Sequence, residues 1–190
     1  MFTSGNLRAA FLFAVCLPTF AALAADSVNV DTARSSVVAT FKQSGVPVDS
    51  PFKKFSGRIV YDPANVTGAS AAIEVDTGSL DIGDEEYNAE VRKAQWFDVA
   101  TYPKATFKST AIRSTGANTF IATGTLTVKG RAQTLSVPIA TRKTANGTAF
   151  EGAFTLSRKA FALGDPLWED VLEDKVGVRF TLISSGGPAK

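Results

Sequence analysis

The side chains that this sequence lacks limit the chemistry open to it. Its 190 residues include no histidine, one cysteine (Cys16) and one methionine (Met1). Histidine is the usual general acid or base near neutral pH, and cysteine is a strong nucleophile and a soft metal ligand. Ten of the fourteen phenylalanines, in contrast, lie beyond residue 40. This composition predicts a protein that binds a ligand in an apolar interior and has no catalytic residues.

Carboxylates are the strong metal ligands that remain. Acidic side chains gather at residues 81–86 and again at residues 169–174. Neither cluster has the alternating oxygen ligands of a calcium-binding loop. The first suits the start of a helix, and the second suits a loop in contact with water. We therefore expect no metal site.

One basic side chain is expected to face the interior. Arg158 continues the alternation of Phe154 and Leu156, so its guanidinium should point inward or toward the mouth of a barrel. A buried arginine needs an acidic partner or an anionic ligand. Two interpretations of Arg158 stay open, a structural salt bridge and a contact with the headgroup of a ligand.

Residues 1–24 have the pattern of a secretory signal peptide. Arg8 precedes an apolar run, and small residues around Ala24 suit cleavage by a signal peptidase. The run is too short for a membrane span and contains Pro18. We expect export and cleavage, which would leave residues 25–190 as one domain, ordered over about residues 27–183.

Alternation of apolar and polar residues with a period of two dominates after residue 26, which is typical of β-strands. Turn sequences such as Lys129-Gly130 and Asn146-Gly147 separate the alternating segments. About eight strands are predicted, and their spacing favours an all-β antiparallel barrel or sandwich. The expected strands lie at residues 37–41, 55–61, 73–75, around 107, 120–129, 135–139, 150–156 and 176–182.

One segment breaks this alternation and predicts a short helix at residues 84–94. Asp84 suits the N-cap, and Tyr87 and Val91 fall on one helical face. Residues 162–175 are expected to form a long loop with a helical turn. The helix would be inserted into an otherwise all-β fold.

The polar side of the expected strands should face water. It includes Arg58, Glu74, Lys108 and Lys129, which do not suit the lipid-facing side of an outer-membrane barrel. Without residues 1–24 the chain has 19 basic and 18 acidic side chains, so it has no strong charge to attract nucleic acid. We expect no nucleic-acid partner and no stable membrane insertion, and we leave a homodimer open.

The apolar side alternates large residues with small ones. An eight-stranded closed sheet is about the size at which the interior either fills with side chains or encloses one small ligand. The small residues at inward positions should leave space between the rings; they are Ala39, Gly57, Ala122, Gly124 and Gly152. The residues predicted to line the resulting cavity are Phe41, Phe55, Ile59, Phe107, Phe120, Leu126, Phe154 and Phe180.

Several short motifs, in order over residues 27–183, resemble the YceI-like proteins. They are Phe52-x2-Phe55-Ser56-Gly57, Tyr61-Asp62-Pro63, Trp96-Phe97-Asp98, Gly124-x-Leu126-Thr127-x2-Gly130 and Ser157-Arg158-x2-Phe161-x2-Gly164. The resemblance implies an eight-stranded antiparallel lipocalin-like barrel in the bacterial periplasm. It also implies that the barrel binds a polyisoprenoid or similar amphiphilic lipid of the quinone or prenyl phosphate type, with no other cofactor.

Two positions depart from the pattern of that family. Gln43 and Glu90 stand where many members carry histidine, so the headgroup end of the site is where this chain could differ. We expect a non-catalytic periplasmic lipid carrier whose ligand contacts the predicted lining residues and Arg158. The alternatives are a structural or stress-response module with a filled core and a protein partner, and an enzyme that acts on a lipid.

Overall fold

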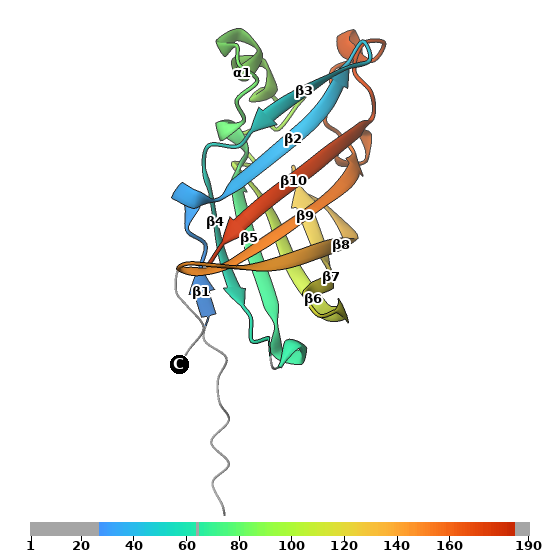
Figure 1. The fold of residues 1–190 in the computed structure, drawn as a ribbon. Coiled ribbons are helices and arrows are strands. Elements are labelled where there is room, and N and C mark those ends of the chain that lie inside the picture. The colour runs from blue at the N-terminus through green and yellow to red at the C-terminus, as the bar shows by residue number, and fades with distance from the viewer. Residues whose placement is uncertain (1–26, 64, 185–190) are drawn as a thin grey trace, which may run out of the picture.

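In the part of the chain that the structure describes, ten strands form a curled antiparallel sheet, which makes a half-barrel with one short helix at one end (Figure 1). The structure, a computed structural model, describes residues 27–63 and 65–184. The predicted signal peptide, residues 1–24, lies outside the described residues. The order of strands across the sheet is β1-β4-β5-β6-β7-β8-β9-β10-β2-β3.

The elements are numbered in the order in which they occur along the chain. The strands are β1 (Ser27–Asn29), β2 (Ser36–Gln43), β3 (Val46–Pro51), β4 (Phe55–Val60), β5 (Ser70–Asp76), β6 (Lys104–Gly116), β7 (Thr119–Val128), β8 (Arg131–Thr144), β9 (Gly147–Ser157) and β10 (Lys175–Ile183). The helix is α1 (Glu85–Val91). The 3₁₀ turns are Thr32–Arg34, Val66–Gly68, Thr77–Ser79, Lys159–Phe161 and Pro166–Trp168.

The predicted number of eight strands is wrong, because the sheet also contains β1 and β3. Strand β1 has only three residues, too few for an alternating pattern. Strand β3 carries Pro47 and Asp49 and so lacks apolar alternation. It forms because Ser44 and Gly45 both adopt positive φ (51° and 80°), which suits the tight turn of a β-hairpin.

The predicted closed barrel is replaced by a sheet whose edge strands, β1 and β3, are not paired with each other. Isolated bridges join the chain just beyond these edges to other elements. Val30 pairs with Ser184 after β10, and Phe52 pairs with Leu80. The curled sheet is therefore held together at both ends without continuous hydrogen bonding around it.

The helix forms where it was expected, but it is shorter. The Asp84 carboxylate caps it by accepting hydrogen bonds from the amides of Glu86 and Tyr87, at 2.8 and 3.2 Å. After Val91 the chain turns, and the amide of Phe97 donates to the Val91 carbonyl. This turn places the side chain of Trp96 in the interior.

The core consists of two clusters of buried side chains. The first joins β2, β4, β9 and β10 with the chain after β1; its members are Val30, Val37, Ile59, Phe150 and Leu182. The second joins β7 to the 3₁₀ turn after β9; its members are Leu126, Val128 and Phe161. The remaining inward side chains line the space between these clusters.

Glycines on the inward face do not leave the gaps that were predicted. A Cβ atom on Gly124 would lie 2.6 Å from Cζ of Phe107, and one on Gly152 would lie 2.6 Å from Cζ of Phe180. A Cβ on Gly57 would lie 2.5 Å from Cδ1 of Ile73. The glycines therefore allow neighbouring side chains to pack directly against the backbone.

Substitution of Gly124 by alanine should lower the free energy of unfolding by about 1–3 kcal/mol. The added methyl group would lie 2.4 Å from the main-chain oxygen of Lys108 and 2.8 Å from Cα of Ser109. These atoms belong to β6 and cannot rotate away. Urea unfolding of Gly124→Ala measures the loss. Gly177→Ala in β10 is the matched control, since its Cβ would meet nothing nearer than 3.8 Å, and equal losses in the two variants would contradict the prediction.

A polar network on the outer surface fixes the edge strand β3. The Asp49 carboxylate in β3 accepts two hydrogen bonds from the Arg179 guanidinium in β10, at 2.6 and 2.9 Å. It also accepts one from the Thr40 hydroxyl in β2, at 2.6 Å. These partners, Arg179 above all, lower the pKa of Asp49 from 3.8 to about 2.

The Asp49 carboxyl should accordingly titrate near pH 2 in the folded protein. Because the folded pKa lies below the unfolded one, the network stabilises the fold above about pH 4 and loses this effect as the pH falls toward 2. Carboxyl ¹³C shifts measured against pH test the value. In Arg179→Gln the midpoint should move back toward 3.8, and a midpoint near 4 in the unsubstituted protein would contradict the prediction.

Candidate ligand-binding site

An apolar cavity of about 280 Å³ lies inside the curled sheet. This volume is near the lower end of the range of about 300–1,000 Å³ that is common for ligand pockets. Its wall is built by β2, β4 to β10, α1 and the loop between β9 and β10. It extends from Tyr61 and Ala69 at one end of the sheet to Tyr87 and Leu172 at the end that carries α1 (Figure 1).

Most of the residues predicted from strand alternation lie on the wall of this cavity. Phe55 does not; its side chain packs against the first core cluster. The predicted residues that the structure places on the wall are Phe41, Ile59, Phe107, Phe120, Leu126, Phe154, Phe180 and Arg158.

Aromatic rings narrow the cavity at the end away from α1. The ring of Tyr61 packs edge to face against Phe120, with centroids 5.6 Å apart, and against Phe150, with centroids 5.2 Å apart. All three rings line the wall. Edge-to-face contacts of this kind stabilise a fixed arrangement, so this end of the cavity has a defined shape.

The other end of the cavity, which α1 and the loop after β9 cover, was not predicted from the sequence. Trp96 and Trp168 both line the wall, and they are the only two tryptophans in the chain. The rings of Tyr87 and Trp168 pack edge to face with centroids 6.0 Å apart, which joins α1 to the loop. The helical face that carries Tyr87 and Val91 could have indicated that α1 covers the interior. The loop has no periodic pattern that could have indicated its position.

The charged groups on the wall gather at the α1 end. Among the described residues that line the cavity they are Glu90, Arg158 and Glu173. The Glu90 carboxylate accepts hydrogen bonds from Nζ of Lys93 and from Nε1 of Trp96, the latter at 3.3 Å. The hydrogen bond from Lys93 is the main cause that lowers the pKa of Glu90, so this carboxylate is ionised near neutral pH.

Gln43, the second position that departs from the family pattern, lies on the wall at the same end. It forms an isolated bridge with Leu172 in the loop after β9. The main chain of Ser44 also donates to the Val171 carbonyl at 2.7 Å. Gln43 and Glu90 are thus parts of the same polar end of the cavity.

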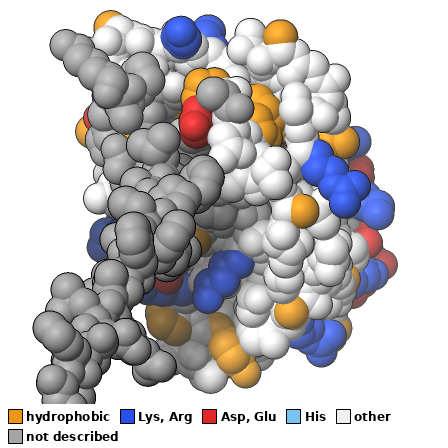
Figure 2. All heavy atoms as spheres, turned by 90° about the horizontal axis from the view of Figure 1, so that it is seen from below, with side chains coloured by type: hydrophobic (Ala, Val, Ile, Leu, Met, Phe, Trp, Pro, Cys, Tyr) orange, Lys and Arg blue, Asp and Glu red, His pale blue; other side chains and the backbone are white. Residues whose placement is uncertain are grey.

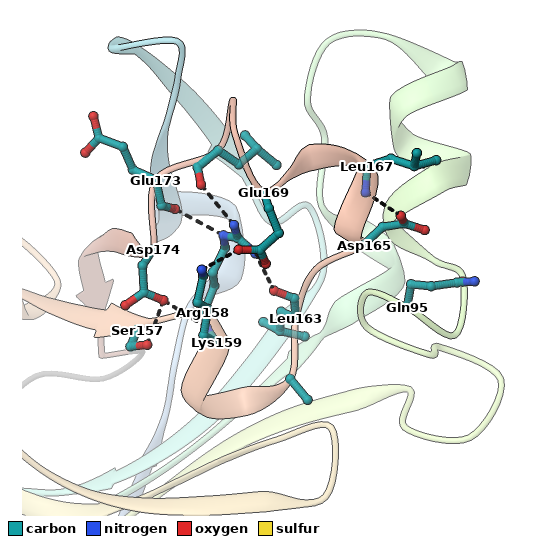
Figure 3. A network of polar contacts seen from close by, with 12 residues as sticks. Gln95, Ser157, Arg158, Lys159, Leu163, Asp165, Leu167, Glu169, Glu173 and Asp174 are labelled. Atoms are coloured by element: carbon teal, nitrogen blue, oxygen red, sulfur yellow. Dashed lines mark hydrogen bonds and ion pairs between the residues drawn. The ribbon is translucent and has the colours of Figure 1, made fainter.

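Arg158 is buried, with 4% of its surface exposed, and its partners lie within the chain (Figure 3). Its Nε, Nη1 and Nη2 atoms donate to the main-chain oxygens of Glu173, Leu163 and Leu172, at 3.1, 3.0 and 2.9 Å. Nη1 also lies 3.6 Å from Oε1 of Glu169. Of the two interpretations left open, these contacts match the structural one, in which the guanidinium holds the loop between β9 and β10.

Within residues 27–63 and 65–184, no group of three or more acidic, histidine or cysteine side chains is placed to hold a metal ion. In the same part of the chain, no helix has the length and apolar character needed to cross a membrane.

A model of the YceI-like domain matches residues 29–183. The chain belongs to the YceI-like family. Its relatives include UPF0312 proteins of Vibrio cholerae, 36% identical over 135 residues that make up 70% of this chain and 71% of theirs. A UPF0312 protein of Azotobacter vinelandii is 32% identical over 169 residues, which make up 83% of this chain and 86% of that protein.

Solved structures are similar over nearly the same part of this YceI-like chain. BcnA of Burkholderia cenocepacia is 40% identical, with a TM-score of 0.79 over 82% of this chain and 99% of that one. A polyisoprenoid-binding domain from Saccharophagus degradans is 18% identical, with a TM-score of 0.69 over 83% of this chain and 97% of that one. The second likeness shows a shared YceI-like fold.

Proposed function

We propose that this YceI-like protein is a non-catalytic periplasmic carrier that holds a polyisoprenoid or similar amphiphilic lipid inside its curled sheet. The observation that carries the proposal is the shape and chemistry of the cavity. Its wall is almost wholly apolar, and its charged groups gather at one end. An amphiphile with a long apolar chain and a small polar head would match this arrangement, with its chain along the apolar wall and its head at the charged end.

The comparisons support the same ligand class. The Saccharophagus degradans domain of the same fold binds polyisoprenoid, and the cavity here offers apolar side chains along the length of the sheet. We propose that the ligand chain lies against rings such as Phe41, Phe107 and Phe154, as in a lipocalin-like barrel. The periplasmic location rests on the signal-peptide pattern of residues 1–24.

A structural module with a filled core was the main alternative. Such a module needs an interior closed by side chains, whereas this one retains a cavity of about 280 Å³. Native interiors are otherwise packed with few voids larger than a water molecule. The cavity therefore favours a role in ligand binding.

Tryptophan fluorescence tests the proposal directly, because both tryptophans of the chain line the cavity. The protein is first stripped of bound lipid on a hydrophobic resin and then titrated with geranylgeraniol below its critical micelle concentration. We expect a saturable change in emission with one ligand per chain. A change that stays linear with ligand concentration, or no change, would count against a lipid site in the cavity.

A further inference from the structure

Arg158 is the only basic side chain among the described residues that line the cavity. Each of its three nitrogens already donates to a main-chain carbonyl, and Glu169 lies beside Nη1. All three carbonyls belong to the loop between β9 and β10, which covers the cavity, so these hydrogen bonds hold the guanidinium to the loop. A phosphate group in the cavity would therefore compete with these carbonyls and with Glu169 for the guanidinium, and the described wall offers no second cationic side chain.

The other two charged side chains of the wall, Glu90 and Glu173, are acidic, and each pairs with a lysine. The side chain of Glu90 is 25% exposed and that of its partner Lys93 is 60% exposed. The side chains of Glu173 and Lys42 are 46% and 52% exposed. A headgroup at the α1 end of the cavity therefore meets the Glu90 carboxylate, while water and salt screen the charges of Glu173 and of the two lysines.

The surroundings of this end add to the negative charge. Two segments cover the α1 end of the cavity, residues 84–93 and residues 158–174. Together they hold nine acidic and four basic side chains, which gives them a net charge of −5. The whole chain, in contrast, has a net charge of +2. Figure 2 shows the opposite end from below, with basic side chains at several places on it and some acidic ones. The two segments that cover the α1 end are thus acidic, although Lys129, which donates to the main chain of Gln95 and Ala162, also lies at this end.

We infer that the cavity selects amphiphiles with a neutral or cationic headgroup, such as prenyl alcohols, phenols or quinones, and excludes prenyl phosphates and diphosphates. This inference rests on the proposed function and names the headgroup class of that same site. A diphosphate would lose water without gaining a cationic partner other than Arg158, which already holds the loop, and it would lie near the Glu90 carboxylate. A hydroxyl or carbonyl head carries neither penalty.

Two ligands that share an isoprenoid chain and differ in their headgroup show how much the headgroup contributes to the affinity. The stripped protein is titrated with geranylgeraniol and with geranylgeranyl diphosphate, and tryptophan emission follows binding. We expect the diphosphate to bind at least about tenfold more weakly at low ionic strength, with a smaller difference in high salt. Equal or tighter binding of the diphosphate would overturn the inference and leave the proposed function standing. If neither ligand bound, the proposed function itself would fail, and the inference with it.

Substitutions then test the residues. The double variant Glu90→Gln, Glu173→Gln should reduce the discrimination against the diphosphate by about threefold or more while geranylgeraniol binds as before. Glu151→Gln is the matched control, because Glu151 in β9 forms an exposed ion pair with Arg142 outside the cavity wall. It should leave the discrimination unchanged. An unchanged discrimination in the double variant would overturn the assignment to these carboxylates.

Discussion

Substitution of Arg158 by methionine should lower the free energy of unfolding by about 3 kcal/mol or more. Methionine fills part of the same volume but donates no hydrogen bonds. The main-chain oxygens of Leu163, Leu172 and Glu173 would lose their guanidinium donors. Buried carbonyls without hydrogen-bond partners destabilise the folded state. The free energy of unfolding should therefore fall, and the covering loop should become less ordered.

Urea unfolding of Arg158→Met measures this loss, and hydrogen exchange of the amides in residues 163–173 locates it. Arg179→Met is the matched control. Arg179 likewise makes several hydrogen bonds, to Asp49 and Thr40, but it lies on the exposed outer surface. Exposed ion pairs contribute less than buried hydrogen-bonded groups, so this variant should lose much less stability than Arg158→Met. Similar losses in the two variants would show that the burial of Arg158 has no special role.

Substitution of Ala71 by phenylalanine should weaken binding of geranylgeraniol by about tenfold or more. Ala71 lies on the cavity wall in β5, opposite Ile59 in β4. A benzyl group at this position would occupy space that the ligand chain needs. The substitution adds apolar volume to a space that already exists, so overpacking should cost at most about 1–3 kcal/mol of stability.

The adjacent residue supplies the control. Ala72 is in the same strand but faces outward and is exposed, so Ala72→Phe adds the same group to the other side of the sheet. Titrations of both variants, with circular dichroism to verify the fold, separate blocking of the cavity from general damage. If Ala71→Phe bound the ligand as tightly as Ala72→Phe, the isoprenoid chain would not occupy this cavity.

Strand alternation located most of the sheet because one face of each long strand is buried. In β7, Phe120, Ala122, Leu126 and Val128 are all buried, whereas Ile121 is 39% exposed. The same parity placed seven of the eight predicted apolar residues on the cavity wall. The inward direction of Arg158 followed from the parity of β9 as well.

The features that were not predicted depend on contacts between distant residues, which alternation of apolar and polar residues does not reveal. The guanidinium of Arg158 is satisfied by carbonyls 5, 14 and 15 residues further along, which only the folded loop brings together. The space predicted beside Gly124 is occupied by the ring of Phe107, which lies in the neighbouring strand. Strands β1 and β3 are held by pairing and by a tight turn, without an apolar face of their own.

Native mass spectrometry of the protein purified from the envelope of a bacterium that produces it tests the central claim most directly. If the cavity holds an isoprenoid lipid, the spectrum should show one tightly retained adduct per chain, with the mass of a polyisoprenoid that has an uncharged head. Ala71→Phe, prepared in the same way, should lose the adduct, and Ala72→Phe should keep it. A chain recovered without any lipid, and unable to take up geranylgeraniol afterwards, would contradict the claim.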